Sequence, residues 1–288
     1  MSNFSYGVIG LGKVGYAFSR NLATMGKLRW VVTSKSRSEI GYSECVVVYK
    51  TIEEISIPVD VIAIAVSDAS IQSVAEKLKS ILPEKKICQV AFHFSGALNI
   101  NLLDELRNIG VKTLALHPMQ TFGVYREDIF DSIFWGVECL ESDRSIAEEI
   151  ISDVGGKAYF LDEAIVKNKA SYHVIGVTAA NFLQGIIEFS RLLCEKQNLP
   201  ADTLLIPILQ TAFDNSLKAI KESKNVPITG PVARGDVEVL HKHVDSLSNK
   251  GFGDIEYKLL VQFLSKLLFE QGKISHNELN KILEIILL

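Results

Sequence analysis

The chain has 288 residues, of which 48% are hydrophobic and 22% are charged, and its formal net charge is −4. These values are typical of a soluble globular protein with one large or two ordinary domains, and the lack of a long basic run excludes nucleic acid and an anionic membrane as expected partners. The apolar runs are too short to span a bilayer, no signal peptide is expected, and the scattered cysteines predict a reduced protein in the cytoplasm with no metal site.

A strand, a glycine-rich turn and a helix are predicted at the start of the chain. Apolar residues run from Tyr6 to Gly10, and Gly10, Gly12 and Gly15 follow the pattern G-x-G-x-x-G before a helix over residues 16–25. The first glycine permits the tight turn, the second lets the backbone approach a diphosphate, and the third lets helix and strand pack closely. The alternative is a glycine turn without a ligand. The predicted dinucleotide site comprises Gly10, Leu11, Gly12, Lys13, Val14 and Gly15.

The second predicted strand, over residues 28–32, is expected to meet the adenosine ribose of the dinucleotide at its end. An Asp or Glu there would favour NAD, but hydroxyls and cations follow instead and suit the 2′-phosphate of NADP. The alternative is a solvated basic loop. We therefore expect NADP, with NAD less favoured, and contacts from Thr33, Ser34, Lys35 and Arg37.

The strand expected over residues 60–66 is wholly apolar after Asp60, as a central parallel strand should be. It ends at the carboxyl edge of the sheet, where ligands bind in open α/β folds. Ala65, Val66 and Ser67 are therefore expected beside the nicotinamide half of the cofactor. Further strands are predicted over residues 45–49, 86–92, 112–116, 134–139 and 157–160, with helices over residues 71–82 and 144–154.

Two histidines follow two consecutive predicted strands at this same edge. His93 and Ser95 come after the strand over residues 86–92, and His117 comes after the strand over residues 112–116. A lone histidine is more often a structural hydrogen-bonding group than a catalyst, but its pKa near neutrality suits proton transfer. Both interpretations stay open for each histidine, and Ser95 is expected to contact the cofactor.

Helical periodicity replaces strand patterns from Glu163 onward. We therefore expect a dinucleotide-binding domain over residues 1–162, with a doubly wound sheet of the Rossmann type, and an all-helical domain over residues 163–288. The predicted helices of the second domain cover residues 163–197, 204–221, 234–247, 255–270 and 276–288.

This arrangement resembles the 6-phosphogluconate dehydrogenase-like superfamily, which includes ketopantoate reductase and pyrroline-5-carboxylate reductase. Three motifs, His93-Phe94-Ser95-Gly96, His117-Pro118-Met119-Gln120-Thr121-Phe122 and Thr229-Gly230-Pro231-Val232-Ala233-Arg234-Gly235-Asp236, are similar to one branch of it. That branch consists of Rossmann-like proteins with a C-terminal domain of unknown function, described as proposed NADP oxidoreductases.

The resemblance implies a catalytic lysine on the first long helix after the Rossmann domain and an asparagine one turn later. Here those positions fall near His173 and Val177, while Lys169 lies one turn earlier and Asn181 two turns later than His173. We therefore expect His173 to donate the proton and Asn181 to orient the substrate, with His117 as the second candidate catalyst and His93 as the third.

The sequence thus predicts hydride transfer between NADPH and a small molecule with a C=O or C=N bond. His93, Lys169, Arg234 and Asp236 are the expected substrate contacts. Arg234 would hold a substrate carboxylate, and the alternative for it is an ion pair with Asp236 beside a helix cap. The alternative function is a non-enzymatic NADP-binding sensor or scaffold. A homodimer is expected through the helical domain, as in the superfamily, against the alternative of a monomer.

Overall fold

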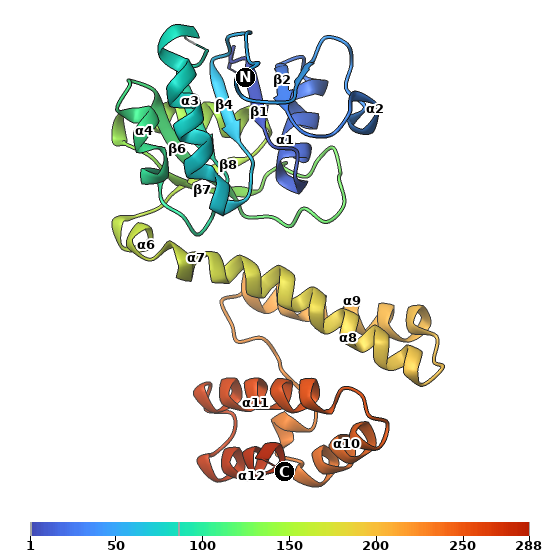
Figure 1. Cartoon of the computed structure of the whole chain (residues 1–288). Coiled ribbons are helices and arrows are strands. Elements are labelled where there is room, and N and C mark those ends of the chain that lie inside the picture. Colours follow the sequence, from blue (N-terminus) through green and yellow to red (C-terminus); the bar gives the residue numbers. More distant parts are fainter. Residues whose placement is uncertain (1, 86, 288) are drawn as a thin grey trace. The chain divides into compact units, whose positions relative to one another are not determined.

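The computed structural model describes residues 2–85 and 87–287, and the chain forms two compact units that divide between Leu183 and Gln184. The first unit contains a sheet with the strand order β3-β2-β1-β4-β5-β6-β7-β8 (Figure 1). Strands β1 to β6 are parallel, β7 is antiparallel to β6, and β8 is parallel to β7. The strands are β1 Tyr6–Ile9, β2 Leu28–Val32, β3 Val47–Tyr49, β4 Val61–Ile64, β5 Val90–His93, β6 Lys112–Pro118, β7 Phe134–Glu138 and β8 Lys157–Phe160.

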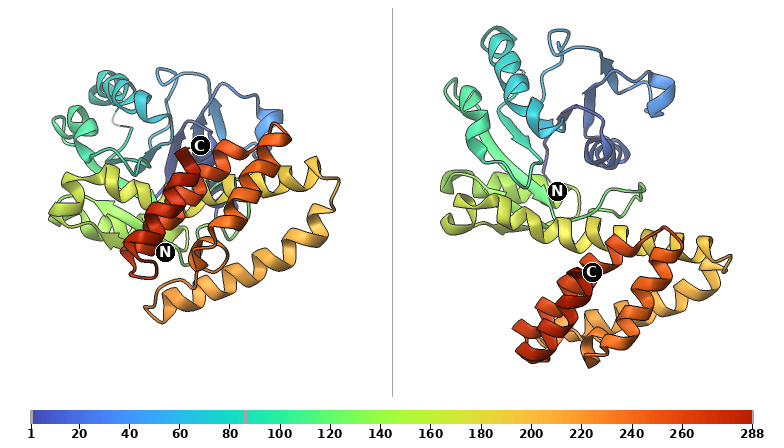
Figure 2. Two further views of the ribbon diagram at one scale, coloured as in Figure 1. Left: turned by 90° about the horizontal axis from the view of Figure 1, so that it is seen from below. Right: turned by 60° about the horizontal axis from the view of Figure 1, so that its bottom comes forward.

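Helices cover both faces of this sheet, as the predicted doubly wound fold requires (Figures 1 and 2). Because side chains alternate along a strand, Val8 of β1 packs in the core beneath α1 and Ile9 packs in the core beneath α3. The Rossmann-type fold predicted from the sequence is confirmed. The helices of this part are α1 Lys13–Thr24, α2 Arg37–Ile40, α3 Ile71–Lys85, α4 Asp104–Arg107 and α5 Arg144–Asp153.

An aromatic cluster fixes α1 on its face of the sheet. The ring of Phe18 is fully buried and makes edge-on contacts with Tyr6, Phe92, Phe130 and Trp135 at centroid distances of 5.7 to 6.2 Å. Edge-to-face pairs of this kind add to the gain from burial. The cluster therefore holds the N-terminus of α1 at the carboxyl edge of β1.

The single helix expected over residues 163–197 is interrupted, and that expectation was wrong. Asn168 leaves the helical region with φ −134° and ψ 47°, so a short helix ends before it and a new one begins at Lys169. A π-helical stretch, Val177–Phe182, then widens the helix. The segments are α6 Glu163–Lys167, α7 Lys169–Gly176 and α8 Leu183–Lys196.

The second unit is helical throughout its regular structure. Helices α10, α11 and α12 pack around a small core that includes Leu240, Val261, Leu268 and Ile282 (Figure 1). Lys86 and Leu288, at the ends of two expected elements, lie outside the described residues. The last strand ends at Phe160, close to the predicted domain boundary at residue 162, and that boundary stays a prediction. The remaining helices are α9 Ala201–Lys221, α10 Val237–Asn249, α11 Asp254–Glu270 and α12 His276–Leu287.

In the described part of the chain, no helix is both long and apolar enough to cross a lipid bilayer. Among the same residues, no three His, Cys, Asp or Glu side chains gather as a metal ion would require.

Candidate functional site

Two glycines of the turn between β1 and α1 are required by the packing of the chain itself. Gly10 has a φ of +91°, and a Cβ atom there would come within 2.6 Å of the Ala65 carbonyl oxygen. A Cβ atom on Gly15 would come within 2.3 Å of the Gly10 carbonyl oxygen. Any larger residue at either position would push α1 away from β1 and β4.

Gly12 differs, because the fold leaves room for a side chain there. A Cβ atom would meet nothing closer than the Ala65 carbonyl oxygen at 4.0 Å, and the φ of −67° suits any residue. Gly12 is the N-cap of α1, which has no side-chain cap and no acidic residue in its first turn. The unpaired amides and the positive end of the dipole therefore face a space that admits an anion close to the backbone.

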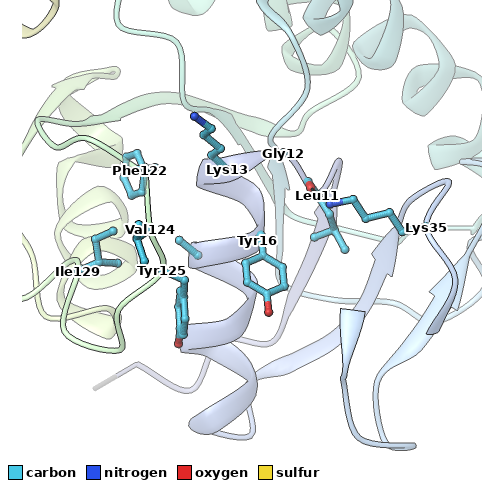
Figure 3. Close-up of a pocket in the computed structure, with 11 residues that line it drawn as sticks. Leu11, Gly12, Lys13, Tyr16, Lys35, Phe122, Val124, Tyr125 and Ile129 are labelled. Carbon is cyan, nitrogen blue, oxygen red and sulfur yellow. Dashed lines mark hydrogen bonds between the residues drawn. The ribbon is translucent and has the colours of Figure 1, made fainter. Parts of the chain in front are cut away.

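A groove of about 380 Å³ lies beside this turn. Lys13 and Lys35 contribute its cations, and Lys35 Nζ donates to the Leu11 carbonyl oxygen at 3.2 Å. In Figure 3, Tyr125 lies on the opposite side of α1 from Lys35. Phe122, in the segment after β6, belongs to a motif that carries the family resemblance, whereas the sequence indicated no role for residues 123–129, although an aromatic residue outside a regular element, Tyr125, was a signal. The lining residues are Leu11, Gly12, Lys13, Tyr16, Ala17, Lys35, Phe122, Gly123, Val124, Tyr125 and Ile129.

The strand ends expected to flank the cofactor do meet at the glycine turn. The Ala65 amide donates to the Ile9 carbonyl oxygen at 2.8 Å, and the Gly10 amide donates to the Val32 carbonyl oxygen at 2.9 Å. Ala65 is buried, while Ser67 lies at the surface and shares a hydrogen bond with Ser70 at 2.8 Å. This places the ends of β1, β2 and β4 at one edge.

The loop after β2 holds its predicted site residues in different ways. Thr33 is buried, and its hydroxyl accepts from the Lys35 amide at 3.2 Å. Arg37 donates from its two terminal nitrogens to the carbonyl oxygens of Ser43 and Val46, at 2.8 and 2.6 Å. The Arg37 guanidinium therefore braces the following loop, whereas the Lys35 ammonium lies over the glycine turn.

His93 is enclosed within a satisfied hydrogen-bond network. Its Nδ1 accepts from the Ser95 amide at 3.2 Å, and its Nε2 lies 3.3 Å from the Asn99 carbonyl oxygen, to which it donates in the resulting tautomer. The Ser95 hydroxyl donates to Asp68 at 2.9 Å and accepts from the amides of Ala97 and Leu98. His93 is fully buried, so the geometry favours a structural role for it, and Ser95 likewise shapes the loop.

Lys169 forms a buried ion pair with Glu138 at the same edge. Its Nζ lies 2.9 Å from Glu138 Oε2 and donates to the Leu98 carbonyl oxygen at 2.6 Å, with only 2% of the side chain exposed. Glu138 also accepts from the Ile100 amide at 3.2 Å. Burial lowers the pKa of Lys169. Its expected contact with substrate stays a prediction, and these bonds favour a positioning role instead.

His117, Tyr172 and His173 form a cluster beside this ion pair. His117 Nδ1 lies 3.2 Å from the Tyr172 hydroxyl, and the ring centroids of His117 and His173 are 5.6 Å apart. Gly96 makes room for the imidazole, since a Cβ atom there would come within 2.7 Å of His117. Gly136 likewise makes room for the Tyr172 side chain, since a Cβ atom there would come within 2.2 Å of the Tyr172 hydroxyl oxygen. The structure therefore brings the second and first candidate catalysts together.

Burial controls the charge of His93, His117 and Tyr172. It lowers the pKa of His93 and of His117 to about 4, and the Lys169 cation adds to the effect at both. Burial also raises the pKa of Tyr172 to about 12. Both histidines are therefore uncharged at neutral pH, and the Tyr172 hydroxyl keeps its proton.

The other predicted site residues lie apart from this cluster or in the second unit. Asn181 is exposed on the π-helical stretch, which changes the register that α-helical spacing predicts between it and His173. In the second unit, Asp236 caps α10 by accepting from the Val239 amide at 3.4 Å, and it lies 4.0 Å from Arg234. The Arg234 side chain is 64% exposed. The roles of these three residues stay predictions.

The depressed pKa of His93 predicts a loss of stability in mild acid. The unfolded chain takes up the proton near pH 6.5, whereas the folded chain takes it up only near pH 4. Unfolding free energy should therefore fall as pH drops through this window, by up to about 1.4 kcal/mol per pH unit for each such histidine. Denaturant titrations at several pH values between 6.5 and 5 should show that the unfolding free energy of His93→Asn falls less steeply with decreasing pH than that of the wild type. The exposed His276→Asn should keep the wild-type slope, and equal slopes for wild type and His93→Asn would contradict the assignment.

Comparisons with known proteins bear on the fold. Residues 1–118 match the Rossmann-like domain model, and residues 133–262 match the model of a domain of unknown function, DUF2520. No curated protein matches the chain.

Solved structures resemble this fold at low sequence identity. A proposed NADP oxidoreductase from Bacteroides fragilis is 22% identical over 91% of this chain and 98% of its own, with a TM-score of 0.73. A pyrroline-5-carboxylate reductase from Coxiella burnetii is 17% identical over 99% of both chains, with a TM-score of 0.56. A reductive aminase from Aspergillus terreus, solved with NADPH and ethyl levulinate, is 15% identical over 98% of this chain and 99% of its own, with a TM-score of 0.61. The chain therefore joins a Rossmann-like domain to a C-terminal DUF2520 domain.

Proposed function

We propose that the protein is an oxidoreductase that transfers hydride between NADPH and a small C=O or C=N substrate. The observation that carries the proposal is Gly12, a position where the fold has room for a side chain but carries none, at the uncapped N-terminus of α1. The structural neighbours support it, because several are described as reductases or aminases with NADP or NADPH bound.

The chain's own residues fit such a cofactor. The amides of the glycine turn and Lys35 would hold its phosphates, and the ends of β4 and β5 would border its nicotinamide. The cofactor supplies the hydride, so the protein must orient the substrate and move one proton.

The histidine cluster suits that proton step. His173 is half-buried on α7, with one side against His117. Because His117 is uncharged at neutral pH, it does not repel a protonated His173. We assign proton donation to His173, and to His117 a hydrogen bond to the substrate oxygen or nitrogen, with the imidazole held by Tyr172.

The Gly12→Ala variant tests the cofactor proposal. Loss of stability should stay below about 1 kcal/mol, the cost of a poorer N-cap residue. Affinity for NADPH should fall at least about tenfold, since the added methyl group occupies the space through which the diphosphate approaches. Fluorescence titration with NADPH and thermal melting measure the two quantities. Gly15→Ala, which clashes with Gly10, is the contrasting control and should lose stability itself. Unchanged NADPH affinity in Gly12→Ala would overturn the proposal.

The His173→Ala variant tests the proton step. NADPH oxidation should be followed with 2-oxo acids and cyclic imines, and NADP reduction with β-hydroxy acids. With the best of these substrates, turnover should fall by about 10² to 10⁴, the usual contribution of a general acid, while NADPH affinity is retained. His276→Ala, in the second unit and exposed, should keep full turnover. Tight NADPH binding without turnover of any substrate would favour a sensor, and full turnover in His173→Ala would remove this residue from the mechanism.

We also propose that the second unit forms a homodimer. Helix α9 exposes apolar side chains around much of its surface, among them Leu204, Ile208, Leu217 and Ile220, and α11 exposes Phe263. Large apolar side chains exposed in this way are a common sign of an interaction surface. Sedimentation of the wild-type protein should give twice the mass of one chain. The double variant Ile208→Glu and Leu217→Glu should sediment with the mass of a single chain. A wild-type protein that sediments as a single chain would refute the dimer.

A further inference from the structure

We propose that Lys50, with Lys35, binds the 2′-phosphate of NADP and sets the preference for NADP over NAD, and that Arg37 does not. This inference rests on the proposed function, since it concerns the adenosine end of the same cofactor. It assigns a specificity role to a residue that follows β3, one strand away from the loop in which the sequence pattern suggested the contacts.

The register of the sheet places Lys50 beside the loop after β2. Strands β2 and β3 are parallel, with Val32 opposite Tyr49, and the Thr33 amide donates to the Tyr49 carbonyl oxygen at 3.0 Å. Lys50, the residue after β3, therefore lies beside Thr33, the residue after β2. In folds of this kind the end of β2 meets the adenosine ribose.

The ammonium group of Lys50 lies on the backbone of that loop. Its Nζ donates to the carbonyl oxygens of Ser34 and Lys35, at 3.1 and 2.7 Å. Its own amide donates to Glu54 Oε2 at 2.8 Å, which fixes the backbone from which the side chain extends. An ammonium has three donors, so at least one stays available on this exposed side chain.

Lys35 provides a second cation on the same loop. Its Nζ contacts the Leu11 carbonyl oxygen at the glycine turn, while its own carbonyl oxygen accepts from Lys50. One ammonium group thus lies at the glycine turn and the other at the backbone of residues 34 and 35. A phosphate esterified to the ribose 2′-oxygen near this loop would be attracted by both positive charges.

Arg37, by contrast, is committed to the fold. Both of its terminal nitrogens donate to backbone carbonyl oxygens of residues 43 and 46. Two of the five guanidinium donors are engaged in this way, and turning the group so that both terminal nitrogens grip a phosphate end-on would leave both carbonyl oxygens without this partner. Arg37, one of the four contacts expected from the sequence, is therefore less available than Lys50 for an end-on grip.

Glu39 supplies the opposing charge at this loop. Its carboxylate accepts from the Ser36 amide and hydroxyl, both at 2.6 Å, and these bonds hold its pKa below the usual range. An ionised carboxylate near a phosphate costs affinity, and a second lysine would offset that cost.

Binding of adenosine 2′,5′-bisphosphate and of 5′-AMP to the full chain separates the possibilities, because the two probes differ only in the 2′-phosphate. Isothermal titration should show that Lys50→Met weakens the bisphosphate about tenfold, the worth of one charge-assisted hydrogen bond, and leaves 5′-AMP unchanged. Lys50→Arg should restore most of the preference. Arg37→Met, the matched control, should keep the wild-type ratio of the two affinities even if the loop loses stability.

Four results would overturn the assignment. An unchanged ratio of affinities in Lys50→Met would make Lys50 a brace for the loop only, and a selective loss of the bisphosphate in Arg37→Met would return the role to Arg37. If the wild-type chain bound NADPH and NADH equally, the specificity role would fail while the proposed function stood. If it bound neither dinucleotide, both would fail.

Discussion

The buried ion pair between Lys169 and Glu138 determines where the candidate catalytic groups lie. It joins the first residue of α7 to the last residue of β7, and the Leu98 carbonyl oxygen and the Ile100 amide complete the hydrogen bonds of both charges. Removing two charges from water is costly, and their mutual attraction offsets that cost only with such complete bonding. The ion pair therefore does more to fix the position of α7 against the sheet than to add net stability. Tyr172 and His173 follow within the next turn, so their position depends on it.

Burial and the Lys169 cation lower the pKa of His93 and of His117, and this helps to separate the functions of the three histidines. His93 is fully buried and already hydrogen-bonded on both ring nitrogens, so it shapes the loop after β5. His117 shares its uncharged state, and Tyr172 holds its ring in a space that Gly96 leaves open. His173 alone of the three is on a helix and retains partial exposure beside His117. A proton can therefore exchange between water and His173 more easily than with the other two.

Most of the first unit could be predicted from the sequence, because apolar runs and glycine spacing are local signals. The strands, the glycine turn and the histidines at the strand ends all follow from them. The break at Asn168 and the π-helical stretch could not be predicted, since neither changes the helical pattern of apolar residues. The burial of Lys169 was also hidden, because a lone charged residue on a helix is usually solvated. The contact of Lys50 with Ser34 depends on strand pairing between residues far apart in sequence.

Charge along the carboxyl edge of the sheet is unevenly distributed, and this pattern agrees with one kind of ligand. Lys35 and Lys50 lie at the β2 and β3 end, and the uncapped N-terminus of α1 lies beside them at β1. At the β5 and β6 end, the histidines are uncharged and the Lys169 cation is neutralised by Glu138. A ligand with phosphates at one end and an uncharged reacting ring at the other would match both halves. An anion such as free phosphate would need only the first half, and it would give no reason to bury an ion pair and two histidines at the other.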